Sequence, residues 1–149
     1  PLTTIPMKGD YCRHDWERMS KMMDIAWTMP DPFPIPTQAA ARAFYWLNDD
    51  NPDLAKSFAK AAFARYFGEG RDITSADAIA EVAAPLGVDQ DALLAAVNDD
   101  AVKQRLKDET AAAIDAGVFG APFFIVDGEG FWGNDRLWMI KRWIKGEAA

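Results

Sequence analysis

One short segment near the end of the chain constrains the fold more than any other. Residues 123–126 read Phe-Phe-Ile-Val, an unbroken apolar run that is typical of a strand buried on both faces. Only one other segment, beginning at Phe131-Trp132, predicts a strand as clearly. Because a lone two-stranded hairpin is marginally stable in water, we expect further strands beside residues 123–126, from another chain or from a segment preceding residue 1. The alternative is that helices alone cover the hairpin.

The residues around this segment predict a strand, a turn, a second strand and a helix. The first strand is predicted over 122–126, and residues 127–130 (Asp-Gly-Glu-Gly) favour a turn because Asp-Gly tolerates positive φ. The second strand begins at 131–132 and is cut short by Gly133. Asn134 is then expected to cap a last helix whose apolar side chains face the core, namely Leu137, Ile140 and Ile144.

The remainder of the chain predicts a block of helices. Each predicted helix begins at a residue that can cap it and carries apolar residues at helical spacing. A proline-rich connector, residues 29–36, should be extended instead, because proline lacks an N–H and disfavours helix in the residue before it. The predicted helix starts are Asp10 (running to about Met23), Thr37, Asn51-Pro52 (to near Gly68), Thr74 in a capping box with Asp77 (to about Ala84), Asp89 (to Val97), and Asn98 or Asp99 (to Gly117).

Composition excludes several classes of function. The chain of 149 residues is 50% hydrophobic, which predicts one globular domain with a sizeable core. Its net charge is −7 with no basic run, so a nucleic-acid partner is not expected. No apolar stretch is long enough to cross a bilayer, and no signal peptide is recognisable.

The single cysteine and the single histidine favour structural roles. Because Cys12 is the only cysteine, this sequence can form neither an intrachain disulfide nor a CxxC redox pair. A reducing, cytoplasmic setting fits best. Cys12 and His14 are two positions apart, so on a helix they diverge and do not form a nucleophile–base pair. We interpret Cys12 as a core residue and His14 as a solvated helix residue, and no metal site is predicted.

Two short segments could form a ligand site. A cis bond before Pro122 would turn the N–H and C=O of Ala121 toward an extended ligand backbone, although a trans proline opening an edge strand is the commoner case. Asn134-Asp135 at a helix start is explained by capping alone. The same residues could also hold an amino acid's zwitterionic end, with N–H groups on the carboxylate and Asp135 on the ammonium. Arg136 opposes the helix dipole there, which hints at a specific partner. Trp132, beside these residues, either faces an aromatic substrate or packs in the core.

The stretch 117–137, GVFGAPFFIVDGEGFWGNDRL, closely resembles the C-terminal segment of 2-hydroxychromene-2-carboxylate isomerases, which are relatives of kappa-class glutathione transferases. Residues 6–19 and 32–44 resemble the same family. The resemblance implies a DsbA-like thioredoxin fold of the α/β class with a large all-helical insertion, here mostly α with one C-terminal β-hairpin. The thioredoxin-like part would comprise 1–29 and 117–149, and the insertion 30–116.

The resemblance also implies a cofactor, glutathione, and the residues that bind it. Ala121, before a cis Pro122, would pair with the cysteinyl backbone. Asp135 would bind the γ-glutamyl end with help from Asn134 and Arg136, and Lys8 would lie near the glycyl end. The family's thiolate-stabilising serine belongs to a first strand–helix–strand unit that nothing in this sequence matches, so we expect it upstream of residue 1.

Three functions remain open at this point. The preferred one is a glutathione-dependent isomerase of aromatic catabolism that acts on a small aromatic carboxylate, 2-hydroxychromene-2-carboxylate. We expect it to be a homodimer in the cytoplasm. Without the serine segment, this chain alone is expected to be inactive. A kappa-like glutathione transferase or peroxidase is the first alternative. The second is a truncated, non-catalytic helical module that dimerises through an exposed sheet edge.

Overall fold

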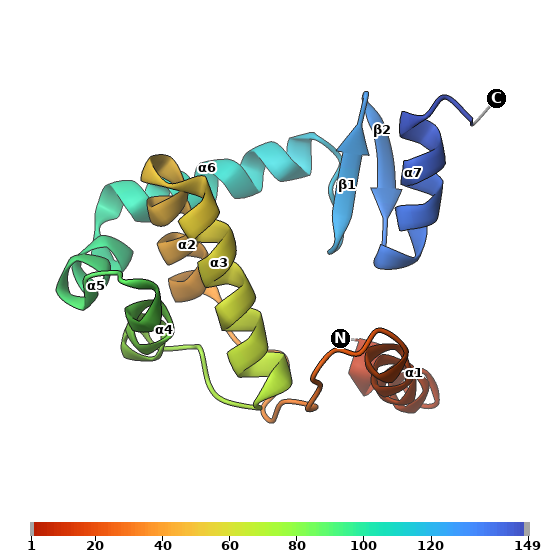
Figure 1. Ribbon diagram of the computed structural model, residues 1–149, viewed down its shortest axis with the longest axis horizontal. Helices are drawn as coiled ribbons and strands as arrows, with labels where there is room; N and C mark the ends of the chain where they lie inside the picture. Colours follow the sequence, from red (N-terminus) through yellow and green to blue (C-terminus); the bar gives the residue numbers. More distant parts are fainter. Residues whose placement is uncertain (1, 148–149) are drawn as a thin grey trace. The chain divides into compact units, whose positions relative to one another are not determined.

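The computed structural model describes residues 2–147 and divides into two compact units, the first ending at Leu106 and the second beginning at Lys107 (Figure 1). The boundary falls within helix α6 (Asp100–Asp115). The first unit is helical. In chain order it contains η1 (Leu2–Thr4), α1 (Lys8–Met22), α2 (Gln38–Asp50), α3 (Pro52–Phe63), the π-helical turn η2 (Ala64–Gly68), α4 (Ala76–Ala83), η3 (Ala84–Leu86) and α5 (Gln90–Asn98).

The core of the first unit is formed by α2 to α5. Helix α2 packs along α3, and α4 and α5 pack on each other and on α2. The largest side chains that are completely enclosed are Phe58, Ile79, Leu93 and Val97. Burial of a side chain of this size contributes about 1.5–3 kcal/mol, so the helical block has a substantial core of its own.

Several predicted helix starts are confirmed by capping hydrogen bonds. The Asn51 side chain accepts from the Leu54 N–H at 3.1 Å, with Pro52 at the first helical position. The Asp89 carboxylate accepts from the Ala92 N–H at 2.8 Å, and the Asp99 carboxylate accepts from the Val102 N–H at 3.1 Å. These caps were predictable because each depends on two residues that are three positions apart.

Two predicted starts are wrong. Helix α4 is capped by Ser75, whose hydroxyl accepts from the Ala78 N–H at 3.0 Å, while Thr74 donates to the carboxylate of Asp72 at 2.8 Å. Helix α1 begins at Lys8, so Asp10 lies in its first turn and is not its cap. The earlier start is held by the Gly9 N–H, which donates to the carbonyl of Ile5 at 2.8 Å.

The connector over 29–36 contains no helix, as predicted, and it is fastened to η2. The N–H of Thr28, the residue just before the connector, donates to the carbonyl of Phe67 at 2.6 Å. The Tyr66 hydroxyl donates to the carbonyl of Pro32, within the connector, at 2.8 Å. The proline-rich segment is therefore a fixed part of the first unit.

The second unit is a β-hairpin followed by a helix. Strands β1 (Phe123–Val126) and β2 (Glu129–Trp132) are antiparallel, and Phe123 lies opposite Trp132. The turn is shorter than predicted: only Asp127 (φ 52°) and Gly128 (φ 83°) connect the strands, because Glu129 and Gly130 already pair in β2. Two successive residues with positive φ form the turn that matches the twist of a hairpin.

The hairpin is less buried than its composition predicts. Ile125 of β1 is 49% exposed, so the expectation of a strand buried on both faces is not met within residues 2–147, where the sheet has two strands. Helix α7 (Leu137–Ile144) follows η4 (Asn134–Arg136). Its Ile140 is buried, and its Trp143 ring packs edge-on against Phe131 of β2, with centroids 5.8 Å apart. Leu137 and Ile144 are 50% and 67% exposed, so their predicted burial is wrong here: a pair of strands offers α7 too little surface to cover.

Within the described residues, no helix combines the length and the apolar character needed to cross a membrane. In the same range, no three or more His, Cys, Asp or Glu side chains are grouped so that they could hold a metal ion.

Candidate functional site

The two segments that the sequence singles out lie together at the open end of the hairpin. Ala121-Pro122 leads into β1, and η4 follows β2. The Gly133 N–H donates to the carbonyl of Pro122 at 2.9 Å, which extends the pairing of the strands by one hydrogen bond. The hairpin therefore brings together five of the predicted site residues, Ala121, Pro122, Asn134, Asp135 and Arg136.

Ala121 offers unpaired backbone groups beside this hydrogen bond. The peptide bond between Ala121 and Pro122 is cis, and both residues are exposed. Neither the N–H nor the C=O of Ala121 has a hydrogen-bond partner among residues 2–147. Both groups are thus available to the backbone of an extended ligand, in the way that a sheet edge accepts a further strand.

The start of η4 differs in detail from the prediction. Gly133, with φ 102°, precedes the helical turn, and Asn134 makes no side-chain capping bond, so the expected Asn134 cap is wrong. The first N–H used within the turn is that of Arg136, which donates to the carbonyl of Gly133 at 3.2 Å. In the part of the chain that the structure describes, the N–H groups of Asn134 and Asp135 have no acceptor, and they can receive an anionic group.

The charged side chains of η4 pair with each other. The carboxylate of Asp135 and the guanidinium of Arg136 form an ion pair, and both side chains are exposed. An exposed pair of this kind contributes at most about 1 kcal/mol, so a ligand can replace it at low cost. Asp135 then offers a negative charge to an ammonium, beside N–H groups and a cation that suit a carboxylate.

Gly133 is the site residue that the sequence analysis missed. A Cβ atom at this position would lie 2.4 Å from Oδ1 of Asp135, so that carboxylate lies directly over the Gly133 backbone. Its φ of 102° also favours glycine. The signal in the sequence was the glycine itself, which was read only as the end of a strand.

Trp132 forms an exposed aromatic surface next to Ala121. Its side chain is 53% exposed, so the core alternative for this residue is wrong. The ring packs edge-on against Phe119, with centroids 5.2 Å apart, and Gly120 leaves room for it, since a Cβ there would lie 2.5 Å from Nε1 of Trp132.

The other candidate residues lie on α1, in the first unit. Lys8 is exposed at the first position of this helix, and its contact with a glycyl carboxylate stays a prediction. Cys12 is half-buried, and His14 is exposed as expected. The predicted division of the chain at residues 30 and 117 also stays a prediction.

The chain as a whole belongs to a known family of proteins. Residues 1–145 match the model of the DSBA-like thioredoxin domain, and the chain belongs to this family. The predicted fold class is thereby confirmed.

Among individual proteins, the chain is similar to 2-hydroxychromene-2-carboxylate isomerases. It is 32% identical over 130 residues to the one from Sphingobium xenophagum, which covers 87% of this chain and 65% of that protein. It is 29% identical over 143 residues to the one from Pseudomonas putida, which covers 92% of this chain and 66% of that protein.

The solved structure of a selenomethionine 2-hydroxychromene-2-carboxylate isomerase superimposes with a TM-score of 0.88 at 26% identity, over 98% of this chain and 70% of that one. The rat kappa 1 glutathione S-transferase is 24% identical over 152 residues (94% and 67%). The chain thus spans just under two thirds of the length of these two isomerases.

Proposed function

We propose that this chain holds glutathione in a glutathione-dependent isomerase that interconverts 2-hydroxychromene-2-carboxylate and o-hydroxybenzylidenepyruvate in aromatic (naphthalene-type) catabolism. The observation that carries the proposal is the Gly133–Pro122 hydrogen bond, which places the open backbone of Ala121 beside the start of η4. The similarity to three proteins named as this isomerase, at 28–32% identity, supports the choice of reaction.

The free groups of the site match the parts of glutathione in order. The N–H and C=O of Ala121 would pair with the cysteinyl backbone. The N–H groups of Asn134 and Asp135, with Arg136, would receive the α-carboxylate of the γ-glutamyl end, while the Asp135 side chain would receive its ammonium. Lys8 is proposed for the glycyl carboxylate on charge alone.

When bound, glutathione supplies a thiolate whose reversible addition turns a substrate double bond into a rotatable single bond. The task of Ala121 is to fix the cysteinyl residue by its backbone, which orients the sulfur without contact to it. The task of Asp135 is to hold the other end of the tripeptide, so that the sulfur is positioned by two separate anchors. No residue among 2–147 is assigned the role of keeping the sulfur ionised.

A homodimer in the cytoplasm is part of the proposal. Within the described residues β1 pairs only with β2, and an open strand edge favours pairing with another chain. The single cysteine and the use of glutathione suit a reducing compartment.

A kappa-like glutathione transferase or peroxidase is the second candidate. It is favoured by the similarity to the rat and human kappa 1 transferases, which are 24% and 26% identical to this chain over 94% of its length. It predicts the same glutathione site and a different second substrate. Assays with 2-hydroxychromene-2-carboxylate and with 1-chloro-2,4-dinitrobenzene, each in the presence of glutathione, distinguish the two candidates.

The experiment that tests the proposal is a calorimetric titration of reduced glutathione into the chain. Asp135→Asn removes the charge that would receive the ammonium and keeps the shape of the side chain, so affinity should fall about tenfold or more, as for other charged hydrogen bonds. Asp115→Asn, at an exposed position at the end of α6, is the matched control and should change nothing. Equal affinities of wild type and Asp135→Asn, or no binding at millimolar glutathione, would contradict the proposal.

A further inference from the structure

The backbone groups of residues 119–121, which lead into the hairpin, have no hydrogen-bond partner within residues 2–147. The residues on either side of this segment are both fixed. The Val118 N–H donates to the carbonyl of Ala113 in α6 at 2.9 Å, and the carbonyl of Pro122 accepts from the Gly133 N–H. The last residue of the segment is the one that presents its backbone in the proposed site, so its position depends on contacts other than hydrogen bonds.

The indole of Trp132 supplies such a contact. One edge of its ring occupies the space where a side chain at Gly120 would begin: a Cβ atom there would lie 2.5 Å from Nε1, 3.1 Å from Cε2 and 3.2 Å from Cδ1. The same ring meets the ring of Phe119 edge-on, with centroids 5.2 Å apart. Trp132 therefore packs on two of the three residues that no hydrogen bond holds.

The hairpin fixes the position of the indole itself. Trp132 is the last residue of β2 and lies opposite Phe123, the first residue of β1. Phe119 also packs edge-on against Phe123, with centroids 5.2 Å apart. Edge-on packing is a favourable arrangement of aromatic rings. The paired strands thus determine, through these rings, where the segment before them lies.

Gly120 is explained by this ring and not by its backbone conformation. Its φ is not positive, unlike that of Gly117 (φ 80°), so alanine could adopt the backbone conformation of residue 120. The three atoms nearest to an added Cβ all belong to Trp132. The glycine is required because the indole lies there, which makes these two residues a coupled pair.

The aromatic cluster contributes little to the core of the second unit. Phe119 is 73% exposed and Trp132 is exposed as well, whereas Phe131, the neighbour of Trp132 in β2, is buried. Burial of apolar surface therefore does not account for a tryptophan at this position. Its contact with the segment that contains Ala121 does.

We propose that Trp132 is a positioning residue, whose indole holds residues 119–121 in the conformation that presents the backbone of Ala121 to a ligand. The proposal rests on the proposed function where it names glutathione as that ligand. In this role Trp132 raises the fraction of molecules that are ready to bind and does not itself touch the ligand. The observed dissociation constant is the intrinsic one divided by that fraction, so loosening the segment weakens binding without removing any contact to the ligand.

The first test measures the order of Ala121 without a ligand, by the ¹⁵N heteronuclear nuclear Overhauser effect of its amide. In wild type the value should match those of β1 and β2. Trp132→Ala should lower it clearly, and Trp132→Phe, which keeps a ring, should largely restore it. Trp138→Ala is the matched control, because it removes a tryptophan of α7 that is 58% exposed, and it should change nothing. An unchanged value in Trp132→Ala overturns the proposal.

Hydrogen exchange separates positioning from a general loss of structure. The Gly133 amide, which is bonded to Pro122, reports on the hairpin itself. Its protection should persist in Trp132→Ala while Ala121 loses order. If both are lost together, Trp132 only stabilises the hairpin, and the proposal is wrong.

Calorimetric titration of reduced glutathione tests the consequence for binding. Trp132→Ala should weaken binding about three- to tenfold through the smaller competent fraction. Gly120→Ala should do the same, because its Cβ displaces the indole. The double variant should be no weaker than Trp132→Ala alone, and a loss equal to the product of the two single losses would contradict the coupling. If wild type binds no glutathione while Ala121 responds as expected, the proposed function alone is wrong.

Discussion

The backbone N–H of Gly133 donates to the carbonyl of Pro122 at 2.9 Å, one residue beyond the Phe123–Trp132 pair at the open end of the hairpin. This hydrogen bond joins the segment before the hairpin to the segment after it. Residues twelve or more positions apart in the sequence, such as Ala121 and Asp135, therefore lie at the same end of the hairpin, in one candidate site. The position of Asp135 in this site depends on Gly133, because the carboxylate lies over the glycine backbone.

Gly133→Ala should accordingly disrupt the site from within. The new Cβ would lie 2.4 Å from Oδ1 of Asp135, so the carboxylate must move, and the φ of 102° is unfavourable for alanine. We expect a loss of about 1–3 kcal/mol in the free energy of unfolding, measured in urea, and a clear loss of glutathione affinity. Gly146→Ala is the matched control: its φ is 69°, but no atom lies within 4 Å of the added Cβ. It should lose stability and keep glutathione binding, and the idea fails if both variants bind glutathione alike.

A pair of phenylalanines on α3 tests where the core lies. Phe58 belongs to the buried core of the first unit and is 1% exposed, whereas Phe63 at the end of the same helix is 64% exposed. Phe58→Ala should cost about 3–5 kcal/mol because it leaves a cavity, and Phe63→Ala should cost less than about 1 kcal/mol. Urea unfolding followed by circular dichroism measures both. Similar losses in the two variants would mean that the core of the first unit is not the one described.

The capping of α5 provides a test that involves local structure alone. Asp89→Ala removes the carboxylate that accepts from the Ala92 N–H and should cost about 1 kcal/mol. Asp91→Ala changes an exposed acid in the first turn of the same helix that makes no capping bond, and it should cost a few tenths of a kcal/mol through the helix dipole. The midpoint of thermal unfolding should therefore fall further for Asp89→Ala than for Asp91→Ala.

The sequence predicted what depends on neighbouring residues and not what depends on distant ones. The caps at Asn51 and Asp89, the hairpin and the order of the helices follow from short-range patterns, and all of them are present. The periodicity of α7 shows which of its faces is apolar, but it does not show whether anything covers that face. For this reason the burial of Leu137 and Ile144 was predicted wrongly.

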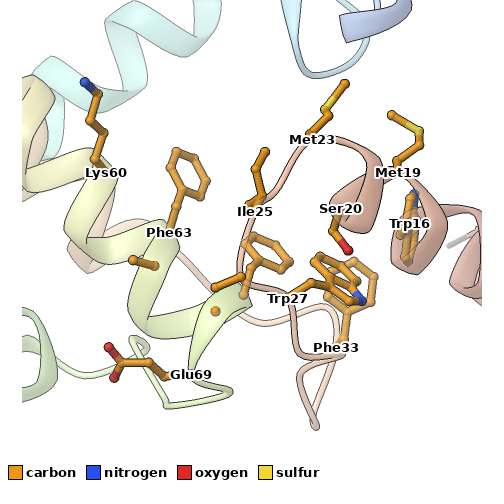
Figure 2. Close-up of a pocket in the computed structure, with 14 residues that line it drawn as sticks. Trp16, Met19, Ser20, Met23, Ile25, Trp27, Phe33, Lys60, Phe63 and Glu69 are labelled. Carbon is orange, nitrogen blue, oxygen red and sulfur yellow. The ribbon is translucent and has the colours of Figure 1, made fainter.

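An apolar pocket of about 760 Å³ in the first unit, lined by rings that include Trp27 and Phe33 (Figure 2), could not be predicted for the same reason. Its walls come from α1, from the segment that follows α1, and from the end of α3 with η2. These parts meet through contacts such as the Thr28 hydroxyl donating to the carbonyl of Gly68, forty positions away. No motif marks Lys60 or Phe67 as members of one site. The proposed glutathione site was easier to recognise, because its two segments are joined by a short hairpin and carry a recognisable run of residues.

The stability of the first unit should decrease at alkaline pH because of Tyr66. Its side chain is 5% exposed, its hydroxyl donates to the carbonyl of Pro32 at 2.8 Å, and burial, aided by the charge of Asp72, raises the pKa of the phenol above its ordinary value of 10.0. The folded chain then holds this proton more tightly than the unfolded chain does. The corresponding stability is complete below about pH 10 and is lost as the pH rises through the pKa of the folded state.

Tyr66→Phe should lose about 0.5–1.5 kcal/mol of unfolding free energy at pH 7, where the hydrogen bond is intact. Urea titrations from pH 7 to pH 11 should show this difference shrinking above pH 10 as the wild type loses its advantage. A difference between wild type and Tyr66→Phe that stays constant to pH 11 would mean that the buried phenol does not titrate in this range and does not link stability to pH.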